Sequence, residues 1–369
     1  MSQQPKPIRI LHVVTNMSFG GLENLLMNYY RNIDRSKIQF DFLTHVDIHQ
    51  DFEEEIRELG GRLYRLPRMN PFSPDYLRRL NSFFCEHPEY QIVHSHLDCM
   101  AGLPLKYAQC NNVPVRIAHA HSSNQVRNLK YVIKMMYKPW ILRYATDLFA
   151  CGKKAGEWMF NGKPFAVVNN AIDTEPFAFQ QEISERVRES LNINGKFVLG
   201  HVGQFRQEKN HLFLIDIFGE VVRKNPDSVL LLVGKGAQME PVMAKVKELG
   251  LEDSVKFLGA RPDIARLMQA MDVFVLPSLY EGLPVTMIEA QAAGLPCVIS
   301  DGVPLECKIT ENVAQIPLAA SPELWAEEIL KYKNVLRTHN HTAIAAAGFD
   351  IKSNAKKLEE FYYNAINRR

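Results

Sequence analysis

Short apolar segments alternate with helical patterns along almost the whole chain, and this alternation restricts the fold more than any other feature. The first series predicts strands at Ile8–Val14, Phe40–Thr44, Arg62–Leu66, Gln91–His94, Val115–His119 and Asp147–Cys151. The second series predicts strands at Phe197–Val202, Ser228–Val233, Val255–Leu258, Val273–Leu276 and Pro296–Ser300. Strands that alternate with helices indicate parallel sheets with crossover helices. The sequence therefore predicts an α/β protein with two doubly wound, Rossmann-like domains.

The length of the chain agrees with two domains. A single hydrophobic core rarely serves more than ~250–300 residues, and this chain has 369. Between 169 and 195 the sequence becomes polar and contains Pro176, which is typical of a connection between domains. We expect a first domain at 1–172, a second domain at 173–350 and a final helix within 351–369.

Composition excludes several classes of protein. The net charge of +2 provides no overall field that would recruit nucleic acid. The six cysteines show no Cys-x-x-Cys spacing, which favours reduced thiols in a cytoplasmic protein. The leader lacks the apolar stretch of a signal peptide, and no apolar run approaches the ~20 residues that span a bilayer. We expect a cytoplasmic protein, either soluble or peripheral at the inner face of a membrane.

The segment 276–300 contains the most informative residues. Glu281 follows a predicted strand directly, and Glu289 lies in an alanine-rich helix that Pro284 opens. Ligands of open parallel sheets bind at the carboxyl ends of the strands, where backbone N–H groups within residues 283–286 can hold an anion. The two glutamates are therefore predicted to face a ligand.

This segment resembles the donor-binding signature of retaining glycosyltransferases of family 4. The resemblance implies the GT-B fold, in which two Rossmann-like domains face a central cleft and the last helix crosses back to the first domain. It also implies that Glu281 faces the donor sugar and that Glu289 binds the ribose of the nucleotide. The donor loop would be formed by Gly282, Leu283 and Pro284.

A second motif lies between the first predicted strand and the first helix. Gly20 and Gly21 there permit close approach of a ligand to the backbone, and they resemble the Gly-Gly-x-Glu loop of the family. A tight strand-to-helix turn is the structural alternative. We expect both glycines to contribute to donor binding.

The segment 203–210 places cations after another predicted strand. Cations are suited to a departing diphosphate, on which negative charge builds as the glycosidic bond breaks. The family usually has arginine directly after Gly203 and lysine six residues after it. Lys209 matches the lysine, but Gln204 stands where the arginine is expected, and Arg206 is the candidate replacement. Exposed surface charge is the structural alternative for Arg206 and Lys209.

Histidines end two predicted strands. The family has a donor-binding histidine at the end of the strand Val115–His119, a role that favours His121 and then His119. His94 and His96 end the preceding strand similarly, and packing is the alternative for any of these histidines. Four neighbouring histidines also raise the question of a metal, which we do not predict because no carboxylate or thiol falls at ligand spacing.

Two further features bear on the donor. Arg261 belongs to a loop that resembles the family segment receiving the base, and Ala171 replaces a glycine of the family motif Asn-Gly-Ile-Asp. The pair Gly234 and Gly236 lacks the third glycine of a dinucleotide fingerprint, which argues against NAD. No Asp-x-Asp motif occurs, so we predict neither a metal on the diphosphate nor a cofactor.

The stretch 127–143 mixes lysines and arginines with aromatic and aliphatic residues. Such a helix can lie on an anionic membrane surface, although packing on its own domain is the commoner explanation. An anionic membrane is thus a candidate partner.

The functional hypothesis is a retaining, metal-independent hexosyltransferase. Its donor would be a nucleotide sugar, with UDP favoured, and its acceptor a saccharide or polyprenyl-linked saccharide in cell-surface polysaccharide synthesis. A non-catalytic scaffold, suggested by Gln204 and Ala171, and a sugar-nucleotide epimerase are the alternatives.

Overall fold

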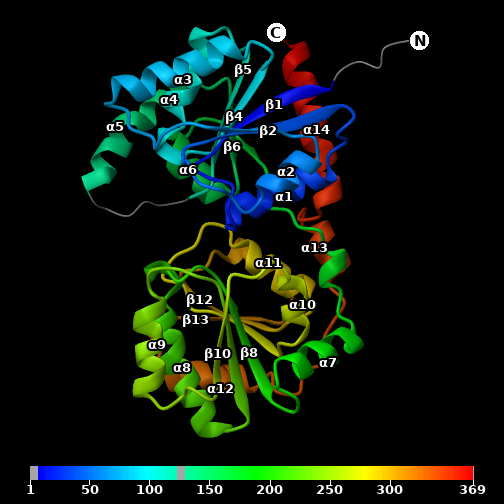
Figure 1. Cartoon of the computed structure of the whole chain (residues 1–369). Helices are drawn as coiled ribbons and strands as arrows, with labels where there is room; N and C mark the ends of the chain where they lie inside the picture. Colours follow the sequence, from blue (N-terminus) through cyan, green and yellow to red (C-terminus); the bar gives the residue numbers. More distant parts are fainter. Residues whose placement is uncertain (1–6, 123–128, 369) are drawn as a thin grey trace. The chain divides into compact units, whose positions relative to one another are not determined.

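The computed structural model describes residues 7–122 and 129–368. The chain forms two compact units, of which the first comprises residues up to Ala171 together with Ile351 onward, and the second comprises Ile172–Asp350. Each unit is a parallel sheet covered by helices on both faces (Figure 1). The α/β class and the doubly wound organisation expected from the sequence are confirmed.

The first unit has a seven-stranded sheet with the order β3-β2-β1-β4-β5-β6-β7. Its strands are β1 (Ile8–Val13), β2 (Ile38–Thr44), β3 (Leu63–Arg65), β4 (Ile92–Ser95), β5 (Val115–Ala120), β6 (Asp147–Ala150) and β7 (Ala166–Val167). Its helices are α1 (Gly21–Asn32), α2 (Glu53–Glu58), α3 (Pro74–Glu86), η1 (Asp98–Met100), α4 (Gly102–Cys110), α5 (Leu129–Tyr144), α6 (Lys153–Phe160) and α14 (Ile351–Asn367).

Alternate residues of each strand supply two different cores, as the two-residue period of a strand requires. On β1, Ile10 packs into the core beneath α1 and α14, whereas Leu11 and Val13 pack into the core beneath α3 to α6. The last helix lies against α1, as Figure 1 shows, and its Glu359 accepts a hydrogen bond from the backbone of Asp34. The prediction that the C-terminal helix returns to the first domain is confirmed.

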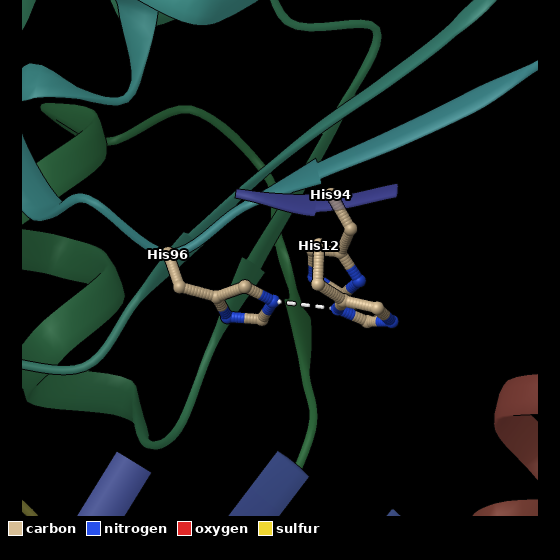
Figure 2. A group of neighbouring side chains, drawn as sticks. All are labelled: His12, His94 and His96. Carbon is tan, nitrogen blue, oxygen red and sulfur yellow. Dashed lines mark hydrogen bonds between the residues drawn. The ribbon is translucent and has the colours of Figure 1, made fainter. Parts of the chain in front are cut away.

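The strand order of the first sheet reverses between β1 and β4. His12 on β1 is the register partner of His94 on β4, and both side chains are buried. Figure 2 shows these two rings beside His96, which hydrogen-bonds to His12. The carboxyl ends of the central strands thus present imidazole rings.

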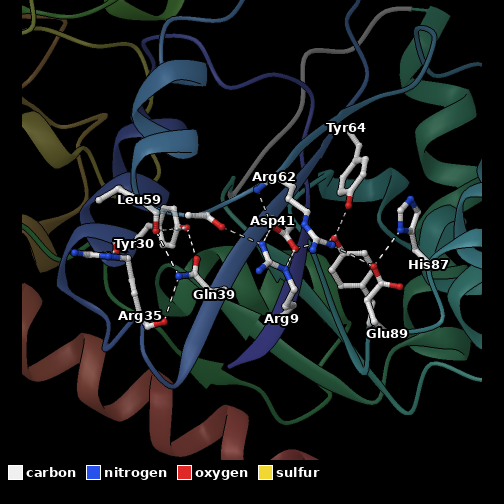
Figure 3. Close-up of polar contacts among 12 residues, drawn as sticks. Arg9, Tyr30, Arg35, Gln39, Asp41, Leu59, Arg62, Tyr64, His87 and Glu89 are labelled. Carbon is white, nitrogen blue, oxygen red and sulfur yellow. Dashed lines mark hydrogen bonds and ion pairs between the residues drawn. The ribbon is translucent and has the colours of Figure 1, made fainter. Parts of the chain in front are cut away.

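A buried ion pair joins β1 to β2 elsewhere in the sheet. Asp41 on β2 is fully buried and accepts hydrogen bonds from both the Nε and an Nη of Arg9 (Figure 3). The Tyr90 hydroxyl and the Arg62 backbone N–H, each at 2.7 Å, complete the environment of the carboxylate. The carboxylate also holds the pKa of Arg9 above its usual value, chiefly through the hydrogen bond. Because the buried carboxylate of Asp41 has hydrogen-bond partners on several sides, we interpret this network as a structural one.

The second unit has a six-stranded sheet with the order β10-β9-β8-β11-β12-β13. Its strands are β8 (Phe197–Val202), β9 (Ser228–Val233), β10 (Val255–Gly259), β11 (Val273–Leu276), β12 (Cys297–Ser300) and β13 (Val313–Ile316). Its longer helices are α7 (Gln181–Ser190), α8 (His211–Lys224), α9 (Met239–Glu248), α10 (Ile264–Gln269), α11 (Val285–Ala292), α12 (Pro322–Leu330) and α13 (His341–Ala346). Short 3-10 turns occur at η2 (Glu175–Phe177), η3 (Gln207–Lys209) and η4 (Leu305–Cys307).

Some local expectations were wrong. The polar stretch 169–195 is not simply a connection, because it contains η2 and the amphipathic helix α7, which contributes Val187 to the core. Pro284 does not occupy the first helical turn; it precedes α11 with extended backbone (ψ 115°) and serves as its N-cap. The edge strands β7 and β13 were not predicted.

Candidate active site

The second sheet reverses its strand order between β8 and β11, the point at which open α/β sheets bind ligands. The loop after β8 carries Lys209, and the loop after β11 carries Glu281. These are the two residues expected from the sequence to act at the diphosphate and at the sugar. The structure brings them into direct contact.

Lys209 Nζ donates a 2.6 Å hydrogen bond to Glu281 Oε1. Ser278 Oγ donates to the same oxygen at 2.6 Å. The side chains of Lys209 and Glu281 are only 17% and 12% exposed, so water screens the pair weakly. Among the described residues, the hydrogen bond of the Lys209 ammonium is the one to Glu281. Its other N–H groups can therefore donate to an anion.

Backbone contacts fix the two loops to each other. Leu279 N–H donates to the carbonyl oxygen of Glu208 at 2.7 Å, and the Asn210 side chain donates to the carbonyl of Pro277 at 3.2 Å. The β9 loop approaches closely as well, because Gly234 adopts a φ of 147° and a Cβ there would lie 2.0 Å from the oxygen of Gly203. Gly203 and Gly234 therefore shape the loops of this site through backbone packing.

Arg206 lies apart from the Lys209–Glu281 pair. Its side chain is 62% exposed, and its guanidinium meets Glu208 at 3.8 Å. No described contact joins Arg206 to Glu281. The idea that Arg206 replaces the arginine missing at Gln204 stays a prediction.

Glu289 lies on α11, one turn after the start of the helix. Burial raises the pKa of its carboxyl group to about 7. The loop residues Gly282, Leu283 and Pro284 precede the helix, with Pro284 accepting a 3.1 Å bond from Met287 N–H. A carboxyl group with a pKa near 7, one turn from the start of a helix, can accept hydrogen bonds from hydroxyl groups of a ligand once it ionises.

Arg261 stands in the loop after β10. Its guanidinium makes two 2.7 Å hydrogen bonds to the carboxylate of Asp263. These two bonds engage Nε and one Nη of the guanidinium.

In the first unit, Gly20 and Gly21 stand where β1 leads to α1. Gly20 caps the helix with extended backbone (φ −166°), which other residues also adopt, and a Cβ on Gly21 would meet no atom within 4 Å. Backbone conformation therefore does not require glycine at position 20, and internal packing does not require it at position 21. Open space in front of the loop is compatible with close approach of a ligand.

His119 is buried on β5, and His121 follows the end of that strand. Their rings lie 4.1 Å apart between centroids. Burial lowers the pKa of both rings, that of His121 to about 3, so both are neutral near pH 7. His121 Nε2 is hydrogen-bonded to His96 Nδ1 at 2.9 Å.

Three residues that contact the Lys209–Glu281 pair or the histidines were not predicted from the sequence. Ser278 bonds Glu281, His12 joins the other histidines, and Tyr362 on α14 hydrogen-bonds His94 at 2.8 Å. His12 could have been found, because it stands near the end of the first strand as His94 does on its own strand. Nothing local marks Ser278 or Tyr362.

Known sequences identify the family. The profile of "Glycosyl transferases group 1" matches residues 183–368, and that of "Glycosyltransferase Family 4" matches residues 19–176. EpsF of Bacillus subtilis, assigned as a glycosyltransferase, is 33% identical over 96% of both chains. The chain belongs to glycosyltransferase family 4. The recognition made from the glutamate motif is confirmed.

Two further comparisons concern a relative and a solved structure. The family-4 chain is 30% identical, over 58% of each chain, to the UDP-Gal:alpha-D-GlcNAc-diphosphoundecaprenol alpha-1,3-galactosyltransferase of Escherichia coli. Its fold matches that of Anabaena HepE, crystallised with UDP-glucose, with a TM-score of 0.79, 19% identity and coverage of 96% and 99% of the two chains. The GT-B fold class is thus supported, and these relatives do not favour a scaffold or an epimerase.

Among the residues that the structure describes, no helix has the length and apolar character needed to cross a membrane.

Proposed function

We propose that this glycosyltransferase retains anomeric configuration and moves a hexose from a UDP-sugar to a saccharide or lipid-linked saccharide in cell-surface polysaccharide synthesis. The observation that carries the proposal is the Lys209–Glu281 contact at the strand reversal of the second sheet. The UDP-galactose specificity named for the E. coli relative and the UDP-glucose bound to HepE support a UDP-hexose donor.

The proposed reaction needs no protein nucleophile. The bond from the anomeric carbon to the UDP oxygen breaks while the acceptor hydroxyl attacks from the same face, and the hydroxyl proton passes to a phosphate oxygen of UDP. Lys209 would stabilise the charge that builds on the diphosphate. Glu281 would orient the sugar and stabilise positive charge at its anomeric carbon. The hydrogen bonds from Lys209 and Ser278 would hold that carboxylate in place.

Other residues would bind the donor. Glu289 would accept the ribose hydroxyls, and His121, with His119 behind it, would face the hexose. The loops of Gly20 and Gly21, of Gly203 and of Arg261 would approach the donor through their backbone. The backbone N–H groups of residues 285 and 286, at the start of α11, would help to hold the diphosphate, together with Lys209 and Arg206.

We propose that transfer is metal-independent and needs no cofactor beyond the donor substrate. The ammonium of Lys209 and the start of α11 would supply the positive charge that a metal provides elsewhere. Complete loss of activity in EDTA, restored by Mg²⁺ or Mn²⁺, would contradict this assignment.

The test is a panel of nucleotide sugars with lipid-linked and free saccharide acceptors. UDP release should depend on the acceptor, and the coupling constant of the anomeric proton in the product should match that of the donor sugar. Inversion of configuration would reject the retaining mechanism. Donor conversion without an acceptor would indicate an epimerase. Lack of turnover with every donor–acceptor pair would favour the non-catalytic scaffold.

A peripheral membrane contact is a second element of the proposal. On α5, Val132 and Met136 lie one turn apart and are 60% and 62% exposed. The charge is partly engaged, because Lys138 Nζ donates to the carbonyl of Trp158 and lies over its ring. We therefore assign the insertion to the apolar residues, with the exposed Arg143 near the end of the helix as a further contact. Residues 127 and 128 of the expected basic stretch fall outside the described residues.

Co-sedimentation with anionic and neutral vesicles tests this contact. Val132→Gln with Met136→Gln should weaken binding to anionic vesicles, and added salt should weaken binding of the unaltered protein. Leu336→Gln, at an 88% exposed leucine of the second unit, is the matched control. Absent or salt-insensitive binding would favour a helix that is only packed on its domain.

A further inference from the structure

Five histidines gather where the first sheet reverses its strand order. His12 on β1 and His94 on β4 are register partners, and His119 on the next strand stacks on His94 with 5.2 Å between ring centroids. His96 and His121 follow the ends of β4 and β5. Among the described residues, ring nitrogens lie within 4.8 Å of one another in two groups of three histidines: His12, His94 and His96, and His96, His119 and His121. Neither group includes a carboxylate or a thiol.

The first hydrogen-bonded chain contains three of these rings. Figure 2 marks the hydrogen bond between His12 and His96. Its Nδ1 to Nε2 distance is 3.0 Å, and His96 Nδ1 lies 2.9 Å from His121 Nε2. Both nitrogens of His96 therefore face other imidazoles. Since each neutral ring has one N–H and one lone pair, the proton on His96 sets the tautomers of both neighbours.

The second chain runs from α14 into the sheet. The Tyr362 hydroxyl lies 2.8 Å from His94 Nδ1, and His94 Nε2 lies 3.2 Å from His119 Nδ1. The chain ends at His119 Nε2, a buried nitrogen with no hydrogen-bond partner among the described residues. An unpaired buried polar atom costs on the order of 1–3 kcal/mol, so this nitrogen calls for a ligand.

We propose that His96, His119 and His121 bind a late first-row transition ion, with Zn²⁺ as the reference case. Ring nitrogens of these three residues lie within 4.8 Å of one another. Ligand nitrogens at ~2.0–2.1 Å from a tetrahedral Zn²⁺ are separated by ~3.3 Å, so only small ring movements are needed. Three imidazoles suit Zn²⁺, Ni²⁺ or Cu²⁺, whereas Mg²⁺ and Ca²⁺ prefer oxygen ligands.

The surrounding hydrogen bonds would hold the ligand rings in the required tautomers. If His96 binds through Nδ1, its Nε2–H can donate to His12, already 3.0 Å away. If His119 binds through the unpaired Nε2, its Nδ1–H can donate to His94 at 3.2 Å. Ligand imidazoles characteristically donate their second N–H in this way. His121 is less buried than the other two ligands and gives the ion a route of entry.

The absence of a carboxylate or thiol, which argued against a metal in the sequence, does not exclude this site, because three histidines form a complete set for a zinc ion with one open position. The ion would not act on the diphosphate. It would occupy the His121 nitrogen that the proposed function assigns to the hexose, so Zn²⁺ should inhibit transfer in competition with the donor. This inhibition rests on the proposed function, whereas binding of the ion does not.

Titration of tag-free full-length protein with Zn²⁺, and with Co²⁺ as a spectroscopic probe, tests the site. We expect one tightly bound equivalent and the intense visible bands of low-symmetry tetrahedral Co²⁺. His121→Gln should weaken binding at least ~100-fold, and His119→Gln should do the same. The control is His49→Gln, at a histidine whose side chain is 71% exposed, which should bind as the unaltered protein does.

His121→Gln decides the outcome if circular dichroism shows that His119→Gln fails to fold. Equal Zn²⁺ affinity in the unaltered protein and His121→Gln would overturn the proposal, as would loss of binding in His49→Gln. Failure to bind Zn²⁺, Ni²⁺ or Cu²⁺ at all would leave the histidines as a hydrogen-bonded core. Binding of Zn²⁺ without inhibition would retain the site and reject only the assignment of His121 to the donor.

Discussion

The two sheets reverse their strand order at corresponding places, but different chemistry stands at each reversal. In the second unit, between β8 and β11, the ammonium of Lys209 meets the carboxylate of Glu281. In the first unit, between β1 and β4, neutral imidazoles meet one another and end at an unpaired nitrogen. The same topology therefore presents charge in one unit and uncharged donors and acceptors in the other.

The difference teaches what each reversal is suited to bind. A diphosphate requires cations and exposed backbone N–H groups, which the second unit offers. Neutral imidazoles suit sugar hydroxyls or a late first-row transition ion, and burial keeps them neutral by lowering the pKa of His94, His96 and His119 well below the usual value. Fold alone would not have distinguished the two.

Removing residues 351–369 should have the largest effect. The effect should fall on the first unit, because α14 belongs to that unit. The helix buries three large side chains, Ile351, Leu358 and Tyr362, worth ~1.5–3 kcal/mol each, and two alanines, a total comparable with the stability of a domain. Calorimetry should show the unfolding transition of the first unit lowered by roughly 10 °C or more. The transition of the second unit should remain.

Tyr362→Phe is the matched variant, since it removes only the hydroxyl group that bonds His94. It should cost about 1–2 kcal/mol. An unchanged melting profile after the truncation would mean that the first reversal does not depend on α14.

Glu281→Gln should reduce kcat by about 10³ while the Kd for UDP changes little, because the amide keeps the shape but loses the charge at the sugar. Glu208→Gln, at a carboxylate that meets the exposed Arg206, is the control and should remain active. If Glu281→Gln weakened UDP binding and left kcat unchanged, Glu281 would lie at the nucleotide instead.

Lys209→Ala and Arg206→Ala compare a partly buried with an exposed cation after β8. Each should lower kcat by about 10² if both meet the diphosphate. The double exchange Gln204→Arg with Arg206→Gln should restore activity if the charge is accepted at either position. A harmless Arg206→Ala would instead make Arg206, whose side chain is 62% exposed, a surface charge with no part in binding the diphosphate.

The smallest effect concerns pH and Glu289, whose pKa is raised to about 7 by burial. If Glu289 binds the ribose as proposed, the hydroxyls bind its ionised form, which is about 90% populated at pH 8 and about 10% at pH 6. Affinity for a UDP-hexose should therefore fall up to about tenfold as the pH is lowered across this window. Calorimetric titration measures it, and Glu289→Gln should remove the dependence. A pH-independent Kd in the unaltered protein would remove Glu289 from the ribose site.

The strongest strands were predicted closely because their signal is local. Runs of β-branched and aliphatic residues gave β8, β9 and β11 their observed bounds. The edge strand β7 has only two residues, both exposed, and α13 is a six-residue helix with a single buried side chain. Such elements owe their form to their neighbours and carry no strong pattern.

The sequence by itself determined the two α/β halves, the glutamate motif and the placement of its chemistry at strand ends, because periodicity and motif spacing are properties of neighbouring residues. Only the tertiary structure decided which strand ends meet. Lys209 reaches Glu281 across 72 residues, His12 reaches His96 across 84, and His94 reaches Tyr362 across 268. Strand order and side-chain direction create these contacts, and neither is written in the local sequence pattern.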